Sequence, residues 1–232
     1  MISLKRNELF KLFKTGFEQI NIQTIENPSG ELTEMDIMDS QETWQLKEYY
    51  VSKRKWIDAA RLYEMKACLD RNVMISIDYY GFEKMMITHA EYWITALLYA
   101  ESGMIAYARS LLKSHQVQSE IIWNDIKEDP SEFSDWTHAL WHEFQGDMYA
   151  LIDIEQSLRF HELAKSLQQP LIEENEQAET YNAYWIHYHE LYQHTLESIL
   201  EQPIQIPYDS PQRIEYKMML AQQIHTRYGM KK

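Results

Sequence analysis

The stretch AEYWITALLYAESGMIAYARSLL, residues 90–112, determines the fold class that we predict for this chain. Its first half belongs to an apolar stripe that recurs every three or four residues from Met86 to Ala100, the spacing of one face of an α-helix. Gly103 interrupts the pattern, and a second helical pattern resumes directly after it. A turn this short places two helices side by side and antiparallel, so we expect an α-hairpin here.

A second hairpin is predicted in ALWHEFQGDMYALIDIEQSL, residues 139–158. We interpret Gly146 as the end of one helix and Asp147 as the N-cap of the next, which continues to Pro170. The number of residues between the two glycine turns is close to the period of helical-hairpin repeats, but the residues around the turns do not repeat. We therefore predict an irregular, helical-repeat-like stack of antiparallel hairpins.

Helical patterns cover most of the remaining chain, and glycine and proline are scarce, with 6 of each among 232 residues. We predict one all-α domain over residues 1–232, with a long helix from Ser40 to Leu69 and another from Leu171 to Leu200. The predicted parts are an N-terminal helix over 3–20, a connection over 21–40, helical hairpins over 41–200, and an extended segment with a last helix over 201–232.

Charge limits the classes of partner. The chain has 36 acidic and 22 basic residues, a formal net charge of −14, and the window 131–180 is its most acidic part. Nucleic acids and anionic membranes attract the opposite sign, so we expect neither as a partner, whereas a basic protein is favoured. Cys68 is the single cysteine, and no apolar run reaches signal-peptide or membrane-spanning length, so we expect a cytoplasmic protein.

The acidic window also carries aromatic residues, a combination that suits an interface with a basic protein: aromatic anchors to bury and carboxylates to pair with Lys or Arg. The alternative is that the aromatic residues form the core and the acids are merely solvated. We predict a partner-binding surface formed by Glu128, Asp129, Glu132, Asp135, Glu143, Asp147, Asp153 and Glu155.

Two histidine clusters raise the question of a metal site. His138 and His142 are four residues apart, but Ala139 occupies the position where the zinc motif HExxH needs glutamate. His187, Glu190 and His194 lie on one helical stripe, which we interpret as a polar, partly solvated face. The chain has no Glu-x-x-His motif and no glycine-rich phosphate loop. We therefore predict no catalytic residue, no metal and no cofactor.

The two quoted segments, together with the acidity and size of the chain, resemble the all-helical immunity proteins of bacterial polymorphic toxin systems, over about residues 83–200. The resemblance implies a cytoplasmic antidote that binds one cognate toxin and blocks it. Two alternatives remain open at this point. One is a helical-repeat scaffold or regulator of an endogenous protein, and the other is a metal-dependent helical enzyme that uses one of the two histidine clusters.

Overall fold

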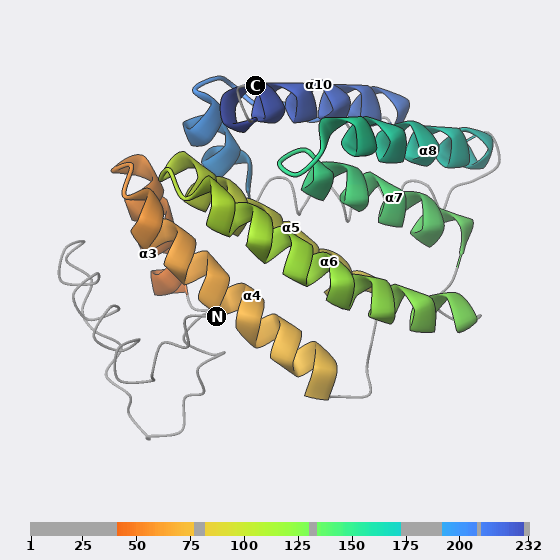
Figure 1. Ribbon diagram of the computed structural model, residues 1–232, viewed down its shortest axis with the longest axis horizontal. Helices are drawn as coiled ribbons and strands as arrows, with labels where there is room; N and C mark the ends of the chain where they lie inside the picture. The colour runs from red at the N-terminus through yellow and green to blue at the C-terminus, as the bar shows by residue number, and fades with distance from the viewer. Residues whose placement is uncertain (1–40, 77–81, 130–133, 173–191, 208–209, 230–232) are drawn as a thin grey trace.

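The computed structural model describes residues 41–76, 82–129, 134–172, 192–207 and 210–229, and every regular element in these residues is a helix (Figure 1). The all-α prediction is confirmed. The predicted helix over 3–20 and the connection over 21–40 lie outside the described residues. The helices are α3 (Gln41–Ser52), α4 (Trp56–Ser76), α5 (Phe82–Glu101), α6 (Ile105–Glu128), α7 (Asp135–Tyr149), α8 (Ile154–Ile172) and α10 (Ser210–Tyr228), and residues 192–200 are helical as well.

The hairpin of α5 and α6 agrees with the prediction. Gly103 adopts a φ of +89°, a conformation that glycine reaches without the steric cost of a side chain. The amide of Gly103 donates to the carbonyl of Ala100 at 3.0 Å, and that of Met104 donates to the carbonyl of Tyr99 at 2.8 Å. These bonds satisfy two carbonyls at the end of α5 and reverse the chain within a few residues.

The second hairpin differs from the prediction. Helix α7 continues through Gly146 to Tyr149, and the turn lies at residues 150–153. Asp153, rather than Asp147, caps the next helix, because its Oδ1 accepts from the amides of Glu155 at 3.0 Å and Gln156 at 3.3 Å. The interpretation of Gly146 as a helix end is therefore wrong.

Gly146 has a packing role inside α7. A Cβ built on this residue would lie 2.6 Å from Cε1 and Nδ1 of His161 in α8, closer than carbon atoms approach in folded proteins. The Ser157 hydroxyl of α8 also donates to the Gly146 carbonyl at 2.6 Å. The missing side chain thus lets α7 and α8 come together at this point.

The Gly146→Ala variant is expected to unfold at lower denaturant concentration than the wild type. In an exposed helix this change adds about 0.5–1 kcal/mol of stability, but overpacking against the buried His161 costs typically 1–3 kcal/mol and reverses the sign. Urea unfolding followed by circular dichroism measures the difference. The Gly146→Ala/His161→Ala double variant removes the clash, so alanine at 146 should cost less in that background. An equal cost in both backgrounds would contradict the packing role.

The helix predicted from Ser40 to Leu69 is broken into α3 and α4. Arg54 has a φ of +53°, and the amide of Lys55 donates to the carbonyl of Tyr50 at 2.8 Å, which ends α3. The break falls in the run Lys53–Lys55, which contains neither glycine nor proline. Helix α4 then continues past the predicted end to Ser76.

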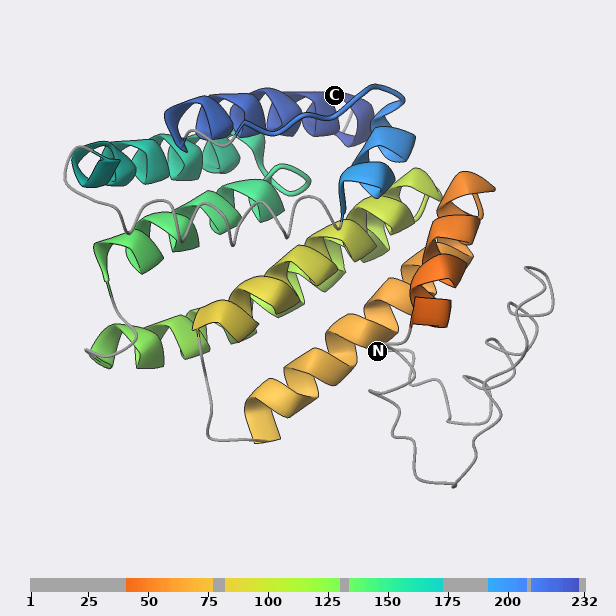
Figure 2. The same cartoon turned by 180° about the vertical axis from the view of Figure 1, so that it is seen from behind.

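The described helices form two groups (Figures 1 and 2). Helices α3 to α6 pack in chain order, while α8 packs against both α7 and α10, and α5 contacts α7 where the two groups meet. Buried residues such as Trp93, Leu97 and Phe144 form one continuous core across both groups. None of the described helices is long and apolar enough to span a membrane.

Candidate functional site: a buried ion cluster and an acidic surface

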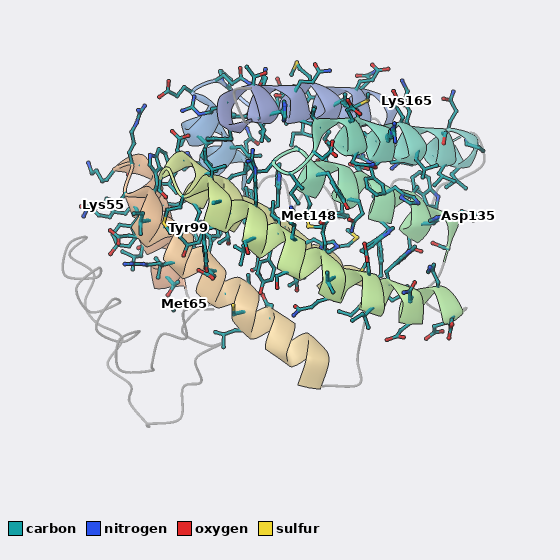
Figure 3. All side chains as sticks on the ribbon, in the orientation of Figure 1. Lys55, Met65, Tyr99, Asp135, Met148 and Lys165 are labelled. Atoms are coloured by element: carbon teal, nitrogen blue, oxygen red, sulfur yellow. The ribbon has the colours of Figure 1, made fainter. Side chains whose placement is uncertain are left out.

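The structure separates the eight predicted partner-binding residues. Glu128 and Asp129 are exposed at the end of α6, and Asp135 is exposed at the start of α7. Asp153 and Glu155 are exposed at the other end of α7, which is about 22 Å long for its 15 residues. The labels of Asp135 and Met148 in Figure 3 mark these two ends. Glu132 lies outside the described residues, and the remaining two, Glu143 and Asp147, are buried.

Glu143 is fully buried between α7, α8 and α10. The Arg213 guanidinium donates from Nε to Oε1 at 2.9 Å and from Nη2 to Oε2 at 3.1 Å, a two-point ion pair. Lys217 Nζ lies 3.0 Å from Oε1, and Gln168 Nε2 donates to Oε2 at 2.9 Å. Burial alone would raise the pKa of Glu143, but the charges of Arg213 and Lys217 outweigh it and hold that pKa well below its usual value.

Asp147, one helical turn further along α7, completes the cluster. Lys217 Nζ donates to its Oδ2 at 2.6 Å, and His161 Nε2 lies 3.6 Å from its Oδ1. Burial raises the pKa of Asp147 to about 6 despite the lysine. Burial, reinforced by the charge of Lys217, lowers the pKa of His161 to about 3, so this ring stays neutral. We call Glu143, Asp147, Arg213 and Lys217 the C-terminal ion cluster.

The cluster sets the axial register of α10 against α7. The two acids are four residues apart on α7, and the two bases are four residues apart on α10. A slip of α10 by one turn, about 6 Å, would leave one acid and one base buried without their partners. Because an unpaired buried charge costs several kcal/mol, we infer that the cluster selects one alignment of the two helices.

The inclusion of Glu143 and Asp147 in the partner-binding surface is therefore corrected. Their carboxylates are enclosed by Arg213, Lys217 and Gln168, and a partner cannot reach them while α10 is in place. Acids at positions i and i+4 follow the same pattern on a solvated face and on a buried one. A signal that could have found them is the matching pair of bases at the same spacing in the last helix.

A second ion cluster lies where α3, α4 and α5 meet. Lys66 Nζ donates to Asp70 Oδ2 at 2.7 Å, and the Lys47 ammonium lies 4.5 Å from the ring centroid of Tyr63. Glu91 is buried beside them, and burial, together with the charge of Asp70, raises its pKa well above the usual value. We call Lys47, Lys66, Asp70 and Glu91 the N-terminal ion cluster.

Four histidines in the described part of the chain form two pairs. His138 Nε2 and His142 Nε2 face each other at 3.1 Å, and His89 Nδ1 contacts His115 Nε2 in the core. Burial lowers the pKa of His142 to about 4 and that of His89 to about 3. Within the described ranges no three His, Cys, Asp or Glu side chains converge on a point that could hold a metal ion. Of the other predicted cluster, His187 and Glu190 lie outside those ranges, and His194 is exposed.

Three aromatic residues of the acidic window lie in the interior of the protein. Trp136, Trp141 and Phe144 are buried, and Trp141 stacks on Trp123 of α6 with ring centroids 5.0 Å apart. They are part of the core and are not available as interface anchors. Phe133 lies outside the described residues.

The outer surface of α6 carries apolar side chains that the sequence interpretation did not single out. Val117 and Ile121 are 62% and 60% exposed, more than any other large hydrophobic residue in the described part of the chain. They lie one turn apart, and Glu120, Asn124, Asp125 and Glu128 are exposed around them. We call these six residues the α6 outer face.

Comparisons of the chain with protein-family models, with curated proteins and with solved structures found no match.

Proposed function

We propose that this chain is an immunity-type antidote, a non-enzymatic protein that acts in the cytoplasm and binds a basic cognate toxin over its substrate-binding surface. The observation that carries the proposal is that the two largely buried ion clusters account for none of the excess negative charge. The two ion clusters contain four acidic and four basic residues. Setting these aside from totals of 36 and 22 leaves 32 acidic and 18 basic residues for the rest of the chain.

A surplus of this size suits the capture of a basic protein. A toxin that acts on nucleic acid needs a positive groove for phosphates, and an acidic surface that occupies the groove excludes them. Complementary charge also raises association rates by a factor of roughly 10–1,000 at low salt. Rapid capture matters for an antidote, because the toxin must be blocked before it reaches its substrate.

The proposal predicts that a toxin gene lies next to the gene of this chain, and the toxin domain that it encodes is the partner to test. We expect coexpression of this chain to restore growth to cells that produce the toxin domain, and the two purified proteins to form a complex that weakens as salt rises. A complex that does not form at low salt, together with no rescue of growth, would contradict the proposal.

Charge reversal at the junction of α6 and α7 tests the electrostatic part. The Glu128→Lys/Asp135→Lys variant is expected to bind the toxin domain about tenfold or more weakly at low salt, mainly through slower association. Both residues are exposed, and losing the acid in the first turn of α7 should cost only about 0.3–1 kcal/mol of folding stability. Surface plasmon resonance at two salt concentrations measures the effect.

The matched control is Glu48→Lys/Glu162→Lys, which changes the net charge equally at exposed positions on α3 and α8. We expect this control to bind more tightly than the junction variant. Equal losses in both variants would show that only total charge matters and would remove the junction from the contact surface.

A further inference from the structure

The two apolar residues of the α6 outer face, Val117 and Ile121, lie on the side of the helix opposite its buried stripe. Eight residues of α6 are buried, and Ser119 lies in the middle of this buried stripe. Val117 and Ile121 lie two positions before and after it, so at 100° per residue each points about 160° away from it. They therefore occupy the centre of the side that faces solvent, rather than the edge of the core. In Figure 1 α6 lies in front of α5, and in Figure 2 it lies behind, so this side is the one turned to the viewer in Figure 1.

Helix formation does not account for these two residues either. Valine and isoleucine are β-branched and lose side-chain freedom in a helix, so they form helices less readily than the alanine, lysine or glutamate common on exposed faces. An amphipathic helix places polar residues opposite its buried stripe. Two adjacent apolar residues at that position are better explained by contact with a second molecule.

We infer that the α6 outer face is the surface with which this chain contacts its basic toxin, with Val117 and Ile121 as the apolar centre of the contact. This inference rests on the function proposed above and names the site of binding. It transfers the centre of the contact from α7, where Glu143 and Asp147 are buried, to the neighbouring helix α6.

The charged residues of the α6 outer face indicate which kind of molecule binds there. Four exposed acids lie near the apolar pair, Glu120, Asp125 and Glu128 on α6 and Asp129 directly after it, against two exposed lysines of the same helix, Lys113 and Lys127. A toxin surface that fits would present an apolar side chain surrounded by Lys or Arg, so that the charges pair around the buried contact. A second copy of this chain is disfavoured, because two such faces, each on a molecule of formal charge −14, would bring like charges together.

The test compares two alanine variants in binding to the toxin domain encoded by the neighbouring gene. Val117→Ala/Ile121→Ala removes the apolar centre, and because alanine favours helix, this variant should fold at least as well as the wild type. We expect its affinity to fall by roughly 10–100-fold, as for central residues of an interface. The control Ile57→Ala/Leu163→Ala truncates hydrophobic residues of 40% and 42% exposure on α4 and α8, and it should bind as the wild type does.

Salt separates the apolar contribution from the charged one. The loss caused by Val117→Ala/Ile121→Ala should persist at high salt, whereas the loss caused by Glu128→Lys/Asp135→Lys should shrink. If Val117→Ala/Ile121→Ala binds as tightly as the wild type, the inference is overturned while the antidote function stands. If the wild type itself neither binds nor protects, the proposed function is overturned as well.

Analytical ultracentrifugation of this chain alone tests the alternative that a second copy of the chain binds the α6 outer face. We expect the wild type and Val117→Ala/Ile121→Ala to sediment identically as the concentration increases. A dimer of the wild type that Val117→Ala/Ile121→Ala abolishes would assign the face to a second copy of the chain, and would overturn the inference.

Discussion

The Arg213→Met variant is expected to lose about 3–5 kcal/mol of unfolding free energy, which is a large part of the 5–15 kcal/mol typical of a folded domain. Methionine fills similar space but leaves the Glu143 carboxylate buried without the two-point pair at 2.9 and 3.1 Å. Stability would be measured by urea unfolding, followed by both circular dichroism and tryptophan fluorescence. If the expected loss approaches the total stability, the variant should be largely unfolded even without urea.

Two further variants separate the buried charge from lost packing. Glu143→Gln/Arg213→Met removes the buried acid with its base and leaves Lys217 paired with Asp147 at 2.6 Å, so it should recover part of the loss. Arg227→Met breaks a two-point pair with Glu101 at the surface and should cost about 1 kcal/mol or less. A loss in Arg213→Met no greater than that in Arg227→Met would contradict the importance of burial.

Acid is expected to destabilise the protein from about pH 6.5 downward. Burial lowers the pKa of both His89 and His161 from 6.5 to about 3, so between these values the unfolded chain binds two protons that the folded chain does not. The free energy of unfolding therefore decreases as the pH is lowered, by up to about 1.4 kcal/mol per pH unit for each proton. Asp147 acts in the opposite direction, because its pKa of about 6 lets the folded state bind a proton first. These three groups together give a net loss of about 3 kcal/mol between pH 6.5 and 4.5. His142, with its pKa lowered to about 4, adds to this loss, and Glu91, with its raised pKa, offsets part of it.

Below about pH 4.5 the loss should continue, because Glu143, with its pKa held low, contributes stability that disappears as it is protonated. Urea unfolding at a series of pH values measures the slope. The His161→Gln variant should have a shallower slope above pH 4.5 whatever its absolute stability, and His194→Gln, at an exposed position, serves as the control. A wild-type stability that does not change between pH 6.5 and 4.5 would show that these histidines are not kept neutral by the fold.

The helices that the sequence predicted best are those with a physical signal in their own residues. The apolar stripe from Met86 to Ala100 and the glycine at 103 describe α5 and its turn. Pro203 and Pro207 precede α10, and Pro211 lies in its first turn. The break at Arg54 has no such signal, because lysine and arginine favour helix. Arg54 Nη2 lies 2.9 Å from Glu201 Oε1, a contact with a distant part of the chain that helix propensity does not show.

Gly146 and the acids around it show why the candidate site was harder to predict than the fold. Glycine is common both at helix ends and where two helices approach closely, and only the position of His161 distinguishes the two. Whether Glu143 and Asp147 are buried or exposed likewise depends on Arg213 and Lys217, which lie 70 residues away in the chain. Local pattern contains no information about such a distant partner.

The same separation of 70 residues orders events during synthesis. At about 5–20 residues per second, a ribosome adds Glu143 and Asp147 roughly 4–14 s before it adds their bases, Arg213 and Lys217. In that interval Glu143 and Asp147 have no cation in place, and burying each carboxylate unpaired would cost several kcal/mol. We therefore expect α7 and α8 to complete their native packing only when α10 has left the ribosome.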